Sequence, residues 1–188
     1  MLRAYYSSSI EIFCESGEEH VLGELTRRHE FALLGTQRDA WVERVRLLQE
    51  VLEPFHGSIY LEYSIPRMGK RVDVLLLVEH VIFVVEFKVG ASTFLRADLD
   101  QVTDYALDLR NFHEGSHEAL IAPILVSTES VEATHVYNTR IAEDKMMDPI
   151  CCRGPELGEV LRSVLLNCNG VSIDTNAWES SGYKPTPT

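Results

Sequence analysis

The stretch that decides the fold is RVDVLLLVEHVIFVVEFK, residues 71–88. It holds two apolar runs separated by Glu79-His80. Short runs this rich in Val, Ile and Leu are typical of strands buried on both faces of a sheet. Because Glu79-His80 is long enough only for a tight turn, the stretch predicts two antiparallel strands with Val78 opposite Val81.

The same register brings charged side chains together. It places Asp73 opposite Glu86 and Arg71 opposite Lys88, on one face of the sheet. Two opposed carboxylates in a buried sheet repel each other and lose hydration energy, so a positive charge should lie between them. A hard divalent cation, which prefers oxygen ligands, fits that position. Lys88 shares the face of Glu86, where its ammonium can orient or deprotonate a water or stabilise charge developing on a phosphate.

The preceding strand, 59–65, offers a third carboxylate, because apolar side chains occupy alternate positions of that strand. These apolar positions are Ile59, Leu61, Tyr63 and Ile65. With a turn centred on Arg67-Met68, Glu62 lies on the other face of its strand and opposite Asp73. A slip of one residue would turn it away. Glu62 is therefore either a metal ligand or a solvated edge residue.

Further outward, hydrophobic periodicity predicts the remaining elements. Helices are expected at 17–29, 36–52, 97–112 and 155–167. Strands are expected at 59–65, 71–78, 81–89, 120–126 and 148–152, and 131–137 is ambiguous. The order α, β, β, β, α, β across 36–126 predicts an α/β domain: a mixed central sheet flanked by helices, with extra helices at both ends. This single domain spans 1–178, and 179–188 is predicted to be a linker.

Three segments together resemble a known family: IPRMGKRVD at 65–73, FVVEFKVG at 83–90 and DQVTDYALDL at 100–109. Asp73 followed by Glu86-Phe87-Lys88 looks like the D…ExK form of the PD-(D/E)XK nuclease superfamily, and Gln101 with Tyr105 resembles the QxxxY motif of one of its branches. The segments are similar to the N-terminal region of bacterial Schlafen-group-like DNA/RNA helicases. The similarity covers about residues 37–126, and the ending 183–188 resembles the run into the helicase part.

The resemblance implies a restriction-endonuclease-like core and metal-dependent hydrolysis of phosphodiester bonds in DNA, with RNA as the alternative substrate. Asp73 and Glu86, with the Phe87 carbonyl, would hold Mg²⁺ or Mn²⁺, and Lys88 would assist the reaction. Gln101 would touch the metal-bound water or a phosphate, and Tyr105 would steady Gln101. A helicase domain, joined to the chain or separate from it, would be the partner.

The first helix departs from this pattern, because superfamily members commonly place a Glu there. Glu43 lies roughly opposite the apolar stripe of helix 36–52, whereas Gln37 lies on the stripe. Glu62, Gln37 or Glu43 could complete the metal site. Because of this departure, a second function is possible: a catalytically weak nuclease-fold module that binds nucleic acid or a partner protein. A plain structural domain with internally paired charges is the third possibility.

The composition limits the partners. Seventeen Lys and Arg stand against 29 Asp and Glu in 188 residues, a net charge of −12, which argues against a protein that coats nucleic acid generically. A small basic patch beside the site, Arg67, Lys70 and Arg71 with Gln37, is expected to contact nucleic acid. Four cysteines without a CxxC pattern favour a reducing cytoplasm, and no apolar run is long enough to span a membrane. His113 and His117 are interpreted as loop histidines rather than zinc ligands.

Overall fold

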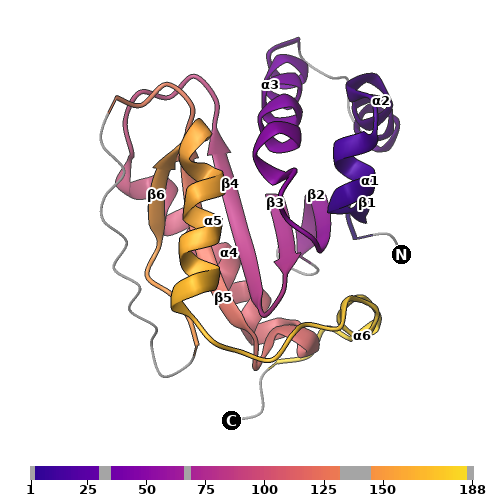
Figure 1. Ribbon diagram of the computed structural model, residues 1–188, viewed down its shortest axis with the longest axis vertical. Helices are drawn as coiled ribbons and strands as arrows, with labels where there is room; N and C mark the ends of the chain where they lie inside the picture. The colour runs from indigo at the N-terminus through magenta and orange to yellow at the C-terminus, as the bar shows by residue number, and fades with distance from the viewer. Residues whose placement is uncertain (1–2, 30–34, 66–68, 132–144, 186–188) are drawn as a thin grey trace.

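The computed structural model describes residues 3–29, 35–65, 69–131 and 145–185 (Figure 1). The strands are β1 (Tyr6–Ser9), β2 (Ser58–Ile65), β3 (Lys70–Val78), β4 (Val81–Lys88), β5 (Leu120–Ser127) and β6 (Ile150–Arg153). The α-helices are α1 (Ile10–Glu15), α2 (Glu18–Arg28), α3 (Gly35–Leu52), α4 (Arg96–Phe112), α5 (Leu157–Asn167) and α6 (Thr175–Ser180). The 3₁₀ turn Glu114–Ser116 follows α4, and the 3₁₀ turn Gly154–Glu156 precedes α5.

The six strands form one sheet in the order β1-β2-β3-β4-β5-β6. Neighbours from β1 to β4 pair antiparallel, whereas β4, β5 and β6 run parallel. Helix α4 makes the crossover that the parallel β4–β5 pair requires. The predicted order of helix, three strands, helix and strand is confirmed by α3, β2, β3, β4, α4 and β5, and the mixed sheet of an α/β fold is confirmed with it.

Helices cover both faces of the sheet. In Figure 1, α5 lies in front of the sheet and α4 behind it. Helix α3 buries the stripe that the sequence predicted, Trp41, Val45, Leu48 and Leu52, in the same core cluster as α1, α2 and α5. Helix α4 packs Val102, Tyr105, Ala106 and Leu109 into a second cluster, on the other face, with Trp178 of α6. Burial of each large apolar side chain contributes about 1.5–3 kcal/mol, so the sheet is stabilised from both sides.

The β3–β4 hairpin confirms the predicted register at its turn. Val78 pairs with Val81, and the ladder continues to the pair Val74–Val85. Glu79 accepts a left-handed φ of 53° in the turn. Beyond Val74 and Val85 no further ladder pair joins the described residues of β3 and β4. The expected pair of Arg71 opposite Lys88 is therefore wrong, because the strands separate before they reach it.

Strands β2 and β3 both reverse the faces of their side chains at one position. Leu61 and Val74 pack on the α3 side of the sheet, but Tyr63 and Val72 pack on the α4 side. Regular alternation would keep residues two apart on one face. The reversal occurs at Glu62, whose φ of 52° is left-handed. The predicted single apolar face of 59–65 is therefore wrong beyond Leu61, although the register that places Glu62 level with Asp73 is retained on both sides of the reversal.

The two ends of the chain carry elements that periodicity did not predict. β1 and α1 precede α2, and the predicted linker begins within α6 rather than after the domain. Gly182 N donates to Glu114, and Lys184 N donates to the Phe112 carbonyl, so residues up to 184 are held against the end of α4. The ambiguous segment 131–137 lies, apart from Val131, outside the described residues. In the part of the chain that is described, no helix combines the length and the apolar character needed to cross a membrane.

Candidate active site

Four side chains from β4 and α4 form one hydrogen-bonded series. Lys88 Nζ donates to Glu86 Oε1 at 3.1 Å and to Gln101 Oε1 at 2.9 Å, and Gln101 Nε2 donates to Tyr105 Oη at 2.7 Å. Glu86 and Lys88 share a face of β4 because side chains alternate along a strand, and Gln101 and Tyr105 share a face of α4 because they are four residues apart. The structure thus brings together four of the five residues that the sequence proposed as catalytic.

The fifth residue, Asp73, lies where β3 and β4 separate. Its Oδ2 accepts a hydrogen bond from Phe87 N at 2.9 Å, so a side-chain oxygen substitutes for a backbone acceptor beyond the last ladder pair. The regular cross-strand pair expected for Asp73 and Glu86 does not form among the described residues, because the Asp73 side chain enters between the strands. Burial is the larger cause of the raised pKa of Glu86, and the nearby charge of Asp73 raises it further.

A buried arginine that the sequence analysis did not single out joins Asp73 to Glu62. Arg44 of α3 is 7% exposed. Its Nη1 lies 3.0 Å from Glu62 Oε1 and its Nη2 lies 3.0 Å from Asp73 Oδ1. Trp41 Nε1 also donates to Glu62 Oε1, at 2.9 Å. The sequence predicts a positive charge between Asp73 and Glu86; in the structure this guanidinium lies between Asp73 and Glu62 instead.

A sequence signal for Arg44 exists. It lies three residues after Trp41 and one before Val45, so it occupies the apolar stripe of the helix. An arginine on a buried stripe needs anionic partners. Glu43, which the sequence analysis considered, is exposed instead. Gln37 is half-buried near the start of α3 and contacts His29, with 3.2 Å between Gln37 Nε2 and His29 Nε2.

Asp98, also not anticipated, adds a fourth carboxylate. Its Oδ1 lies 3.3 Å from Lys88 Nζ, and its position in the first turn of α4 suits a negative charge. We call the whole set the carboxylate cluster. Its members are Arg44, Glu62, Asp73, Glu86, Lys88, Asp98, Gln101 and Tyr105. Four carboxyl groups face two cationic side chains, so the cluster holds more acidic groups than it can neutralise internally.

Glu86 bears most of this imbalance. It is 5% exposed, and within the described part of the protein its Oε2 has no hydrogen-bond partner. Burial and the charge of Asp73 raise the pKa of Glu86 to about 8, although Lys88 and Arg44 oppose the shift. Burial also raises the pKa of Glu62, against the opposing effect of Arg44. A buried oxygen without a partner costs free energy, so this position is one where a ligand would stabilise the protein.

A divalent cation fits the cluster in charge and in ligand type. All its acidic groups are oxygen donors, which Mg²⁺ and Mn²⁺ prefer. Asp73 and Glu86, with the Phe87 carbonyl, are the residues that would hold the cation, and the free Oε2 of Glu86 is available to it. The described residues contain no group of three or more acidic, histidine or cysteine side chains arranged to hold a metal ion. The fit therefore rests on two carboxylates, with Glu62 engaged by Trp41 and Arg44.

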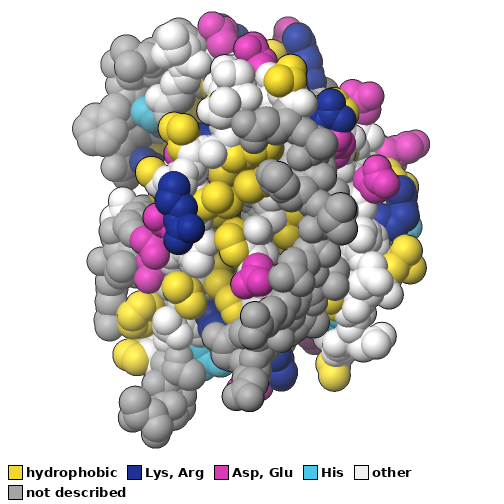
Figure 2. Space-filling model, turned by 90° about the vertical axis from the view of Figure 1, so that its left-hand side faces the viewer, with side chains coloured by type: hydrophobic (Ala, Val, Ile, Leu, Met, Phe, Trp, Pro, Cys, Tyr) yellow, Lys and Arg dark blue, Asp and Glu magenta, His cyan; other side chains and the backbone are white. Residues whose placement is uncertain are grey.

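The predicted nucleic-acid patch is described only in part. Arg67 lies outside the described residues. Lys70 is described through its backbone, which pairs with Ile65 at the start of β3. Arg71 is exposed and lies over the ring of Tyr5, 4.7 Å from its centroid, with a hydrogen bond to the Tyr5 hydroxyl. On the face shown in Figure 2, described basic side chains stand apart from one another among acidic and hydrophobic ones, in keeping with the net charge of −12.

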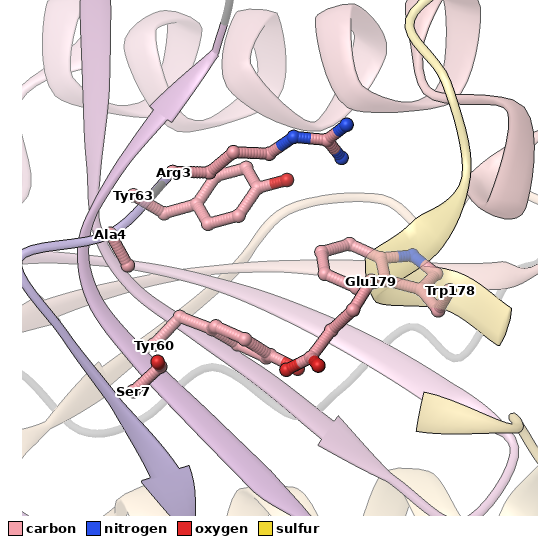
Figure 3. Close-up of a pocket in the computed structure, with 7 residues that line it drawn as sticks. All are labelled: Arg3, Ala4, Ser7, Tyr60, Tyr63, Trp178 and Glu179. Atoms are coloured by element: carbon pink, nitrogen blue, oxygen red, sulfur yellow. The ribbon is translucent and has the colours of Figure 1, made fainter. Parts of the chain in front are cut away.

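A separate pocket of about 610 Å³ lies over β2. Figure 3 shows Arg3 and Tyr63 on one side of it, Tyr60 and Glu179 on the other, and Trp178 beside them. Its polar groups bond to protein atoms: Tyr60 Oη donates to Glu179 Oε1 at 2.7 Å, and Arg3 Nη2 donates to the Ser181 carbonyl at 2.8 Å. Unlike the carboxylate cluster, this pocket is lined by residues from near the beginning and near the end of the described chain.

Compared with protein-family models, with curated proteins and with solved structures, the chain matches none of them. The chemistry of the site therefore has to follow from its own side chains.

Proposed function

We propose that this domain is a divalent-cation-dependent nuclease that hydrolyses phosphodiester bonds, with DNA as the favoured substrate and RNA as the alternative. The observation that supports it best is that Asp73, Glu86, Lys88 and Gln101 lie together in a partly accessible, net acidic cluster, in which one Glu86 oxygen has no hydrogen-bond partner among the described residues. The side chains of Asp73 and Lys88 are 17% and 24% exposed, so a phosphate can approach them from solvent.

Each residue has a chemical role in this proposal. A cation held by Asp73 and Glu86 would lower the pKa of a water and stabilise charge on the phosphate. Lys88 directs an ammonium at the same space, where it can orient the water or stabilise the developing charge. Tyr105 accepts from Gln101 Nε2, which turns Gln101 Oε1 towards Lys88. Gln101 thereby holds Lys88, and Tyr105 holds Gln101.

The net charge supports a partner for the nuclease. A chain with 29 acidic and 17 basic residues gains little affinity from phosphate contacts of its own. A helicase domain, in the same chain or associated with it, would deliver the strand to the site. We therefore expect the isolated domain to bind nucleic acid weakly and only with divalent cations present.

One observation favours a second candidate, a nuclease-fold module that binds without cutting. Arg44 engages Oδ1 of Asp73, a residue that would hold the cation, and Lys88 is paired with both Glu86 and Asp98. Such internal pairing can keep a cation from binding. Binding of nucleic acid without cleavage would favour this candidate over the nuclease.

The test is a cleavage assay on end-labelled single- and double-stranded DNA and RNA with Mn²⁺, with Mg²⁺ and with EDTA. The variants are Glu86→Gln and Lys88→Met. Their matched controls are Glu118→Gln and Lys184→Met, whose wild-type side chains are 87% and 72% exposed. We expect cleavage with the cations, none with EDTA, and a loss of at least about 100-fold in both site variants, as for groups that act in the transition state.

Unchanged cleavage in EDTA, or in both site variants, would show that another site or a contaminant is responsible. Equal losses in the control variants would point to unfolding rather than chemistry, which a thermal unfolding curve of each variant resolves.

A further inference from the structure

Arg44 connects the two carboxylates of β2 and β3 with one planar group. One nitrogen of the guanidinium lies 3.0 Å from Glu62 and the other 3.0 Å from Asp73. Its Cζ also lies 5.5 Å from the centroid of the Phe87 ring. Burial alone would lower the pKa of Arg44, but Asp73, Glu62 and Glu86 raise it, so the group stays charged. Arg44 therefore serves as the counterion of the buried carboxylates of Glu62 and Asp73.

The two ends of this bridge differ. Glu62 is fixed from elsewhere as well, because Trp41 Nε1 donates to the same oxygen that Arg44 contacts. The left-handed φ of 52° at Glu62 turns its side chain towards α3, at a backbone cost of about 1–2 kcal/mol. Asp73 is also held from elsewhere, because its Oδ2 accepts a hydrogen bond from Phe87 N, but its Oδ1 has Arg44 as its ion-pair partner and Asp73 is one of the residues that would hold the cation. The contact of Arg44 with Asp73 is therefore the one for which a bound cation would compete.

The hydrogen bonding of Arg44 in the cation-free protein is also incomplete. Its Nε is buried and has no hydrogen-bond partner among the described residues. Glu86 Oε2 is likewise buried and without a hydrogen-bond partner among the described residues. A divalent cation bound by Asp73 and Glu86 would satisfy Glu86 and would repel the guanidinium at short range, since like charges in a poorly solvated site interact strongly. The cation and Arg44 therefore cannot both engage Asp73 fully.

We propose that Arg44 is a built-in competitor for the cation: it neutralises Asp73 and Glu62 in the cation-free protein, and a divalent cation displaces it from Asp73 while Glu62 retains it. This inference rests on the proposed cation site at Asp73 and Glu86. It adds that Arg44 sets the cation concentration at which the site fills. Without the cation, Arg44 keeps a cluster of buried carboxylates folded; with the cation, Asp73 is released for binding.

The experiment measures Mn²⁺ binding by titration calorimetry, without any nucleic acid. Arg44→Met removes the charge and keeps a long side chain, and Arg46→Met is the matched control on the same helix, since the Arg46 side chain is 69% exposed and pairs with Glu18. We expect Arg44→Met to bind Mn²⁺ at least about tenfold more tightly than the wild type, because a competing charge is lost, and Arg46→Met to bind like the wild type. Thermal unfolding with EDTA and with Mn²⁺ should show the larger cation-dependent rise in melting temperature for Arg44→Met.

Removing one partner of a buried ion pair can unfold a protein, so a second variant keeps the test decisive. The double variant Arg44→Met with Glu62→Gln replaces the ion pair by neutral groups and leaves a carbonyl oxygen for Trp41 Nε1. It too should bind Mn²⁺ more tightly than the wild type. Equal or weaker binding by a folded double variant would overturn the inference.

The failure of the inference and that of the proposed nuclease can be told apart. Cation-dependent cleavage by the wild type, with unchanged Mn²⁺ affinity on loss of Arg44, would leave the nuclease standing and remove the competition. No Mn²⁺ binding by the wild type or by any folded variant would remove the cation site itself, and the inference with it. Binding seen only after Arg44 is replaced would support the competition in its strongest form.

Trp41 provides an independent signal, because its indole shares Glu62 with Arg44. In a Trp178→Phe background, the emission of Trp41 should change on Mn²⁺ addition in the wild-type site, where Arg44 shifts its contacts. It should change far less with Arg44→Met. An identical change in both would contradict the proposed displacement of Arg44.

Discussion

Two clusters in this protein surround an arginine, and they use it differently. One is the carboxylate cluster with Arg44. The other is an aromatic cluster where the chain ends meet; its members are Arg3, Tyr60, Tyr63, His113, Trp178 and Tyr183. Arg3 lies over the Tyr183 ring and contacts a neutral carbonyl and the His113 ring, whereas Arg44 contacts two carboxylates.

The clusters also differ in how completely their polar atoms are paired. In the aromatic cluster, Trp178 Nε1 donates to Ser116, His113 contacts Ser116 and Arg3, and Tyr63 bonds to Tyr183. In the carboxylate cluster, Glu86 Oε2 and Arg44 Nε are buried without partners among the described residues. Paired polar atoms and packed rings stabilise a fold, while buried polar atoms without partners mark a place that a ligand could complete. The comparison therefore separates a cluster that stabilises the fold from the site that we propose to be functional.

The largest expected effect falls on the aromatic cluster. Trp178 is 2% exposed and contacts the rings of Tyr60, Tyr63 and His113. Trp178→Ala should lower the free energy of unfolding by about 3–5 kcal/mol, measured by urea denaturation. Leu166→Ala, at a residue that is 79% exposed, should change it by less than about 0.5 kcal/mol. Cleavage by folded Trp178→Ala should remain; its loss below the melting temperature would break the separation of roles.

The pH dependence of stability should have opposite signs in the two clusters. Burial and Asp73 raise the pKa of Glu86 from 4.5 to about 8. The cation-free folded state therefore binds a proton more tightly than the unfolded state, and its stability falls as the pH rises from about 4.5 to 8, by up to about 1.4 kcal/mol per pH unit. Glu86→Gln should flatten this slope and be more stable than the wild type at pH 8.

His113 should give the reverse slope. Burial, followed by Arg3, lowers the pKa of His113 from 6.5 to about 4. The neutral ring is favoured in the folded state, so stability is lost as the pH falls from about 6.5 to 4. His113→Gln should remove this loss of stability at acid pH, measured by thermal unfolding from pH 4 to 8. It should leave unchanged the fall in stability between pH 6.5 and 8, which we assign to Glu86. If His113→Gln changed that fall instead, the two clusters would not be independent.

The smallest effect sharpens the comparison within the carboxylate cluster. Tyr105→Phe removes the acceptor of Gln101 Nε2 but keeps the ring packed. We expect cleavage to fall about tenfold, since a positioning hydrogen bond is worth about 1.4 kcal/mol in rate terms. The free energy of unfolding should change by less than about 1 kcal/mol. Tyr63→Phe, which removes a hydroxyl from the aromatic cluster, is the control and should leave cleavage unchanged.

His113 shows that a local pattern can give position without giving surroundings. The sequence predicts a loop histidine past the end of a helix, and His113 does follow the last residue of α4. It is nevertheless fully buried, with the rings of Trp178 and Tyr183 against its own ring. Those partners come from a segment predicted as a linker or near it, so no local signal marked them.

Sequence patterns alone predicted the order of elements from α3 to β5, the register of the β3–β4 turn, and the two short spacings that place Glu86 beside Lys88 and Gln101 beside Tyr105. These follow from periods of 2 and 3.6, which act over a few residues. Sequence patterns did not reveal that Arg44 lies between Glu62 and Asp73, that β2 and β3 reverse their faces there, or that residue 181 contacts residue 3, because packing between distant segments produces all three. Arg44 and Glu62 are 18 residues apart and Arg3 and Ser181 are 178 apart, and a buried charge takes whichever partner the fold brings to it, because leaving it unpaired costs more than any local preference supplies.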